Sequence, residues 1–215
     1  GGAGGEEKLH PSPSGGRAGG EGKLRPSTFG RKQGEGIFGI DLSIPSLLLA
    51  QQHAPAASLA CADAHHLPFA DGSFDLVLAH FLLLWVREPL RVLTEMRRVA
   101  RRGGAVMAFA EPDYGGRLDY PAALAQVGAW QTASLHAQGA DPFTGRKLAS
   151  LFAHAGLADV EVGVLGGQWQ PQAYDPAAFE SEWQVIASDL ASLPGAPVSP
   201  ALAARLRRLD EDARR

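Results

Sequence analysis

The pattern of hydrophobic and polar positions changes abruptly at Ile37. Before it, aliphatic residues are almost absent; after it, short apolar runs alternate with longer segments in which apolar residues recur at helical spacing. Short apolar runs bounded by turn residues are typical of buried parallel strands. They predict strands at residues 37–41, 58–61, 74–79 and 105–110. Residues 160, 162 and 164 are valines, and this alternation predicts one further strand with a single buried face.

Helical periodicity and capping residues predict the elements between these strands. A first helix follows Ser43, and a second runs from Pro89 to the pair Gly103-Gly104, with arginines in its last turns, where the helix dipole favours cations. Further helices are expected from residue 121 to 139, from about 148 to 156, around 179–190 and from 199 to 215. Strands that alternate with helices indicate an α/β fold: a Rossmann-like, largely parallel sheet flanked by helices on both faces.

Residues 1–36 differ from the rest of the chain in composition. They hold 12 of the 26 glycines and three prolines, and they offer too little apolar surface to offset the entropy of ordering. We therefore expect three parts: a disordered or non-native segment at 1–36, a core at 37–165 and a helical segment at 166–215. Because the chain begins without Met, we also expect it to be a fragment or a processed product.

Composition and charge narrow the classes of partner. A net charge of -3 gives no reason to expect nucleic acid or an anionic membrane, and no apolar run is long enough to span a bilayer. Cys61 is the single cysteine, which excludes an intramolecular disulfide and indicates a reducing, cytoplasmic location. His65 and His66 are adjacent, and two adjacent side chains in a loop seldom converge on one ion, so we expect no metal. The sequence predicts nothing about oligomeric state.

Four motifs stand in one order over residues 39–104. They are Gly39-Ile40-Asp41-Leu42-Ser43, the loop Asp63-Ala64-His65-His66-Leu67-Pro68-Phe69, the segment Asp71-Gly72-Ser73-Phe74-Asp75-Leu76-Val77, and Glu95-Met96-Arg97-Arg98-Val99 with Gly103-Gly104. Together they resemble the class I methyltransferases that use S-adenosylmethionine (SAM), above all the bacterial group called type 11. Many members of that group carry glutamate where His65 stands.

The resemblance implies a cofactor site at the carboxyl ends of the strands. Asp41 would accept hydrogen bonds from the ribose hydroxyls of SAM, with Leu42 beside it; the alternative is that Asp41 only caps the following helix. Asp63 would bind the adenine amino group and the Ala64 amide the adenine ring; the alternative is an ordinary Asx turn. Ala79 ends the next strand and His80 follows it, where both would contact the cofactor. His80 is also the candidate base, or equally a satisfied, half-buried histidine.

The loop after the strand at 105–110 faces the acceptor in this family. Tyr114 and Tyr120 are therefore candidates for lining a substrate pocket, unless Asp119 is only a helix N-cap on which both tyrosines pack. Asp141-Pro142-Phe143-Thr144-Gly145-Arg146 is also patterned, but suggests no chemistry beyond a helix start. The tryptophans at 130, 169 and 183 are expected between the late helices and the sheet.

The family's glycine-rich loop, and the first strand before it, have no clear counterpart here. The nearest stretch is Gly19-Gly20-Glu21-Gly22, which follows Pro11-Ser12-Pro13-Ser14 instead of an apolar strand. A frameshift or a truncation joined to foreign sequence would explain the difference. The sequence thus predicts transfer of a methyl group from SAM to a small-molecule acceptor, with a truncated or inactive remnant as the second reading and an NAD-dependent oxidoreductase as the third.

Overall fold

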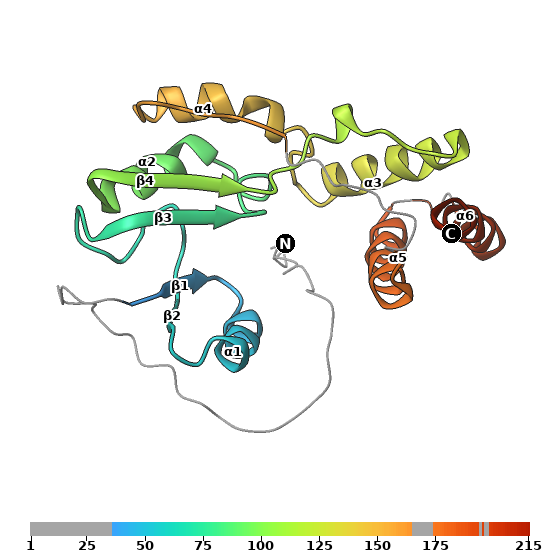
Figure 1. Ribbon diagram of the computed structural model, residues 1–215, viewed down its shortest axis with the longest axis horizontal. Coiled ribbons are helices and arrows are strands. Elements are labelled where there is room, and N and C mark those ends of the chain that lie inside the picture. The colour runs from blue at the N-terminus through green and yellow to red at the C-terminus, as the bar shows by residue number, and fades with distance from the viewer. Residues whose placement is uncertain (1–35, 165–173, 194, 196–197) are drawn as a thin grey trace, which may run out of the picture.

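The computed structural model describes residues 36–164, 174–193, 195 and 198–215. Strands and helices alternate through the first half of this part, and helices alone make up the second half (Figure 1). The α/β class predicted from the sequence is confirmed. The glycine-rich segment lies, apart from Gly36, outside the described residues.

The first unit is a parallel strand pair with one connecting helix. Strand β1 (Phe38–Asp41) pairs with β2 (Ser58–Cys61), and α1 (Ile44–His53) joins them. Gly39 lies so close to the neighbouring strand that a Cβ there would stand 2.8 Å from the Leu59 Cδ2. Ser43 caps α1, because its hydroxyl accepts the Ser46 N–H at 3.2 Å. All three predicted elements are confirmed.

The second unit repeats this order. Strand β3 (Phe74–His80) pairs in parallel with β4 (Ala100–Phe109), and α2 (Pro89–Val99) connects them. The arrows of β1, β3 and β4 point the same way in Figure 1, so their carboxyl ends lie on one side. The apolar stripe of α2, formed by Val92, Leu93, Met96 and Val99, is buried.

The end predicted for α2 at Gly103-Gly104 is wrong. The helix stops at Val99 because Ala100 is already extended, with ψ of 136°, and pairs with Phe74. The following arginines, Arg101 and Arg102, therefore belong to β4. Gly103, with φ of +73°, lies where the register between β3 and β4 shifts, so the glycines accommodate an irregularity in a strand instead of ending a helix.

The described strands form two parallel pairs, β1–β2 and β3–β4, with no hydrogen-bonded ladder between them. Helices α2 and α4 (Leu148–His154) cover one face of the β3–β4 pair, where Ala79, Leu93 and Met96 join one buried cluster. On the opposite face, Leu76, Leu78 and Met107 are 50%, 53% and 37% exposed. One continuous sheet covered on both faces, as predicted, is not present in the described part of the chain.

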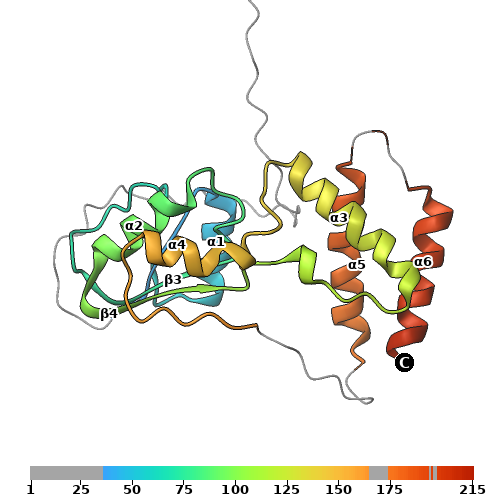
Figure 2. The same ribbon diagram turned by 90° about the horizontal axis from the view of Figure 1, so that it is seen from above.

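The second half of the chain is a group of helices. A short 3-10 turn, η2 (Ala122–Leu124), leads into α3 (Ala125–Ala137), which packs with α5 (Pro176–Ala191) and α6 (Pro200–Arg214). Figure 2 shows these three helices side by side at one end of the molecule, away from the strands. Trp130 and Trp183 pack among these helices and not against the sheet, which corrects the place predicted for them. Trp169 lies outside the described residues.

The strand predicted from Val160, Val162 and Val164 is wrong. Residues 160–164 adopt no regular structure, and Val162 and Val164 are 52% and 96% exposed. The alternation of residue types matches a strand, but no described strand pairs with this segment. A period of two marks a strand only where a neighbouring edge supplies the hydrogen bonds.

Candidate functional site

Two aspartates lie at the carboxyl edge of the first strand pair. Asp41 is the last residue of β1 and stands opposite Cys61, the last residue of β2. The Ala62 N–H donates to the Asp41 carbonyl at 3.2 Å, which prolongs the pairing by one step. Asp63 follows one residue later. The parallel register thus brings Asp41 and Asp63, far apart in sequence, to the same edge.

Asp41 uses one carboxylate oxygen to brace the turn that follows β1. Its Oδ1 accepts the Ser43 N–H at 2.7 Å, whereas Ser43 itself provides the N-cap of α1. The capping alternative therefore accounts for one oxygen only. Asp41 is exposed, and its Oδ2 accepts no hydrogen bond from any residue that the structure describes. Leu42 beside it is 70% exposed.

Asp63 is held in its charged form by His65. Its Oδ1 accepts the His65 N–H at 2.9 Å and faces His65 Nδ1 at 2.7 Å. The backbone N–H of His65, followed by its ring, lowers the pKa of Asp63 below the ordinary value. The predicted Asx turn is therefore present. Within the described chain, nevertheless, neither Asp63 Oδ2 nor the Ala64 N–H has a hydrogen-bond partner, and the buried His65 Nε2 also lacks one.

The loop that carries Asp63 is fixed to α2 by Arg98 and Glu95. The Arg98 guanidinium donates to the carbonyls of Leu67 and Phe69 at 3.0 and 2.8 Å and to both oxygens of Glu95 at 2.8 Å. Glu95 in turn accepts the Leu67 N–H at 2.9 Å. These contacts lower the pKa of Glu95, chiefly through the hydrogen bond from Arg98, and raise the pKa of Arg98.

Glu95 and Arg98 belong to the last of the four motifs, and the motif alone predicts no role for them. An acid and an arginine three positions apart on a helix form a pair on one face, and that spacing was the available signal. Their partner, the backbone of residues 67–69, becomes visible only in three dimensions. The two motifs are thus two sides of one contact between α2 and the Asp63 loop.

The two candidate residues at the end of β3, His80 and Ala79, differ in their exposure to solvent. His80, the last residue of β3, is exposed and stands opposite Phe109 of β4. Ala79 is only 4% exposed and its side chain belongs to the core beneath α2, so it can meet a ligand only through its backbone. His66, in the Asp63 loop, contacts Arg91 on α2. No group of three or more potential metal ligands exists among the described residues.

The two candidate tyrosines are not brought together. Tyr114 packs against Leu84, Leu135 and Ala140, and burial raises its pKa. Tyr120 is 81% exposed and lines no enclosed surface. Asp119 caps no helix, because its carboxylate accepts the Arg117 Nε at 2.5 Å, which removes the capping alternative.

Beside Tyr114 lies a chain of polar side chains that the sequence does not predict. Arg117, whose guanidinium carbon lies 5.9 Å from the centre of the Tyr114 ring, donates to Gln131 Oε1 at 2.6 Å. The Gln131 Nε2 in turn donates to Asp189 Oδ2 at 3.2 Å. Burial raises the pKa of Asp189. These residues come from distant parts of the chain, so spacing gave no signal.

Comparison with known proteins shows what the first half of the chain is similar to. Residues 18–108 match the model of a methyltransferase domain. This region is similar to a methyltransferase domain. The match begins within the glycine-rich segment and so includes Gly19 to Gly22, which lie outside the described residues. An NAD-dependent oxidoreductase, the third reading of the sequence, receives no support from it.

The matches to curated relatives extend over only part of this chain and part of each relative. A demethylmenaquinone methyltransferase of Renibacterium salmoninarum is 38% identical over 84 residues, which are 38% of this chain and 35% of the relative. A phosphatidylethanolamine N-methyltransferase of Cereibacter sphaeroides is 42% identical over 77 residues, 33% of this chain and 38% of the relative. A solved SAM-dependent methyltransferase of Thermotoga maritima aligns with a TM-score of 0.42 and 23% identity, over 54% of this chain and 53% of the other. The chain thus spans about a third of the curated relatives.

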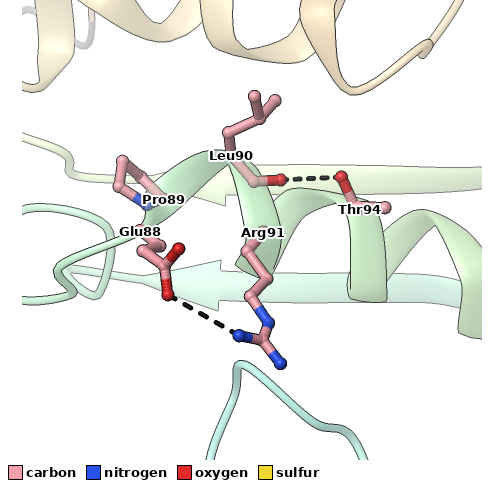
Figure 3. Close-up of a pocket in the computed structure, with 5 residues that line it drawn as sticks. All are labelled: Glu88, Pro89, Leu90, Arg91 and Thr94. Atoms are coloured by element: carbon pink, nitrogen blue, oxygen red, sulfur yellow. Dashed lines mark hydrogen bonds and ion pairs between the residues drawn. The ribbon is translucent and has the colours of Figure 1, made fainter.

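An open hollow of about 520 Å³ lies over the first turns of α2, lined by Glu88, Pro89, Leu90, Arg91 and Thr94 (Figure 3). Its polar groups are already engaged: Arg91 pairs with Glu88 at 3.7 Å, and the Thr94 hydroxyl donates to the Leu90 carbonyl at 2.8 Å. None of the candidate residues of the methyltransferase domain lines it, so we assign it no role. No described helix is both long and apolar enough to cross a membrane.

Proposed function

We propose that this chain transfers a methyl group from SAM to a small-molecule acceptor. The observation that carries the proposal is the pair of aspartates at one carboxyl edge, Asp41 and Asp63, inside the region that matches the methyltransferase model. The relatives named above bear the names of small acceptors, demethylmenaquinone and phosphatidylethanolamine. Those acceptors belong to the relatives, and the class of small molecules is what we extend to this chain.

The atoms left open at this edge fit an adenosine. Asp41 would accept hydrogen bonds from the two ribose hydroxyls, with its Oδ2 and the remaining lone pair of Oδ1. Asp63 Oδ2 would accept from the adenine amino group, while the Ala64 N–H donates to a ring nitrogen. Leu42, the backbone of Ala79 and His80 would complete the set. The His65 backbone N–H and ring, which lower the pKa of Asp63, favour its charged, accepting form.

When bound, SAM supplies a methyl group on a positive sulfur, and the carbon–sulfur bond breaks as the acceptor's lone pair forms the new bond. The residues of this chain contribute alignment and exclusion of water. His80, at the end of β3, would take the proton from an acceptor O–H or N–H. Tyr114 would line the acceptor side through its ring, and the exposed Tyr120 would contact the acceptor at a separate place.

Calorimetric titration of the full chain with S-adenosylhomocysteine tests this proposal. We expect saturable binding, and Asp41→Asn or Asp63→Asn should weaken it about 10- to 100-fold, because each removes one or two charge-assisted hydrogen bonds. Asp75→Asn is the matched control, since Asp75 is exposed near the opposite end of β3. Equal losses in all three variants would refute the assignment of the edge.

A second candidate, a domain that has kept the fold but lost cofactor binding, is favoured by one observation. In the described residues β1 pairs only with β2, and β3 only with β4, so no ladder joins the two halves of the site. The same titration separates the candidates. If the chain gives no heat of binding with S-adenosylhomocysteine and yet unfolds cooperatively, the inactive domain is supported.

We further infer a cytoplasmic location and an acceptor that is neither nucleic acid nor membrane. The free, exposed Cys61 suits a reducing compartment. The net charge of -3 gives no reason to expect attraction to nucleic acid or to an anionic membrane. Localisation of the tagged chain by fractionation tests the compartment. The division into parts at 1–36, 37–165 and 166–215 also stays a proposal, for which limited proteolysis is the direct measurement.

A further inference from the structure

The carboxylate of Glu111, just after β4, binds three consecutive backbone N–H groups of the loop after β3. Its Oε1 accepts from Leu82 and Leu83 at 2.8 and 2.9 Å, and its Oε2 accepts from Leu84 at 3.1 Å. Leu83 and Leu84 are 1% exposed, so these amides have little access to water as an alternative partner. Charge-assisted bonds of this kind are shorter and stronger than neutral ones. One side chain thus fixes the path of the whole loop.

The backbone on both sides of this contact adopts a conformation that side chains with a Cβ rarely take. Phe81, just before the loop amides, has φ of +51°, and Ala110, just before Glu111, has φ of +55°. The Phe81 N–H also donates to the Phe109 carbonyl at 3.0 Å. Left-handed residues other than glycine persist where surrounding contacts over-determine them, and they concentrate at functional sites.

The segment Asp141–Arg146, whose pattern predicts only a helix start, contacts both the loop after β3 and the loop after β4. The Asp141 N–H donates to the Leu84 carbonyl at 2.7 Å, and the Gly145 N–H donates to the Pro112 carbonyl at 2.8 Å. A Cβ at Gly145 would stand 2.7 Å from the Glu111 carbonyl oxygen, so glycine is required for this approach.

Asp113 and Tyr114, which follow Glu111, are held by the same segment. Arg146 forms a forked pair with the Asp113 carboxylate, at 2.7 to 3.0 Å, and the Tyr114 N–H donates to the Pro142 carbonyl at 2.9 Å. The loop after β3, the loop after β4 and residues 141–146 therefore form one hydrogen-bonded unit at the carboxyl ends of β3 and β4.

We propose that Glu111 is a positioning residue for the reaction, a role that rests on the proposed methyl transfer. It joins the loop that begins at His80 and Phe81, on the cofactor side, to the loop that carries Tyr114, on the acceptor side. The two sides of the site are thereby set relative to each other before either ligand arrives. Such preorganisation reduces the entropy lost on binding.

Glu111→Gln tests the role with little change of volume. The amide keeps one accepting oxygen for Leu82 and Leu83 but turns an NH₂ toward the Leu84 N–H, so that donor meets donor. We expect hydrogen exchange at the amides of residues 82–84 to rise, and affinity for S-adenosylhomocysteine to fall by about tenfold, which corresponds to about 1.4 kcal/mol. Glu111→Asp, which keeps the charge, should recover part of both.

Leu206→Ala is the control for a purely structural effect, because Leu206 is buried among the late helices, in a separate cluster from Glu111. It should lower the melting temperature without changing the affinity. Normal affinity in Glu111→Gln, or an equal loss of affinity in Leu206→Ala, would overturn the positioning role alone. Absence of binding by the unaltered chain would remove the proposed function and the positioning role with it.

Discussion

Arg98→Ala should show how strongly the Asp63 loop depends on α2. The substitution removes the donors to the Leu67 and Phe69 carbonyls and leaves the Glu95 carboxylate, whose side chain is 19% exposed, without its cation. The bond to Asp71 adds almost nothing, because that carboxylate is 82% exposed. Charged hydrogen bonds contribute about 1.5–3 kcal/mol when buried, but Arg98 is 31% exposed and water will replace part of the loss. We expect a net cost of about 2–3 kcal/mol.

Thermal unfolding followed by circular dichroism measures this cost. For a domain of this size the expected loss lowers Tm by about 4–12 °C. Arg101→Ala is the matched control, because its pair with Asp75 joins side chains that are 54% and 83% exposed. It should shift Tm by no more than about 2 °C. If both variants lose the same stability, the contact between α2 and the loop is not what holds the loop in place.

Three further predictions concern charge and core packing. Removing the His65 ring (His65→Ala) should raise the pKa of Asp63 toward its ordinary value, as measured by carboxyl NMR titration. In the unaltered chain, the stability that Asp63 contributes is complete above about pH 4. It is lost as pH falls through the lowered pKa of the folded state. Burial raises the pKa of Asp189, so its stabilising contribution exists only below about pH 4 and is lost as pH rises; Asp189→Asn should therefore stabilise the chain at pH 7 and not at pH 3 in urea unfolding. Leu93→Ala, at a fully buried position, should cost about 2–5 kcal/mol in the same assay, and Leu90→Ala, 40% exposed on the same helix, far less.

Local signals in the sequence predicted the elements whose causes are local. Ser43 and Pro45 mark the start of α1, and the apolar period of α2 places its buried stripe correctly. The aspartates at 41 and 63 were assigned to one edge because parallel strands end together, and the register of β1 and β2 agrees. Their roles toward a cofactor stay predictions.

The errors share a different cause, namely pairing with distant residues. Ala100 leaves the helix because Phe74 offers a strand partner. The valines at 160–164 form no strand, since no described strand pairs with them. The role of Glu111 could not be predicted from the sequence for a similar reason. Its partners are backbone amides almost thirty positions earlier, and amides carry no residue-specific signal.

Helix α2 passes into β4 without a connecting loop, since Val99 ends the one and Ala100 begins the other. The Asp63 loop is attached to this segment through Arg98, and the loop after β3 is attached to its far end through Glu111. Both sides of the site are therefore attached to one continuous segment, α2 followed directly by β4. A residue inserted between Val99 and Ala100 would leave each contact chemically intact, yet turn the helix by about 100° relative to the strand and put the two sides out of alignment.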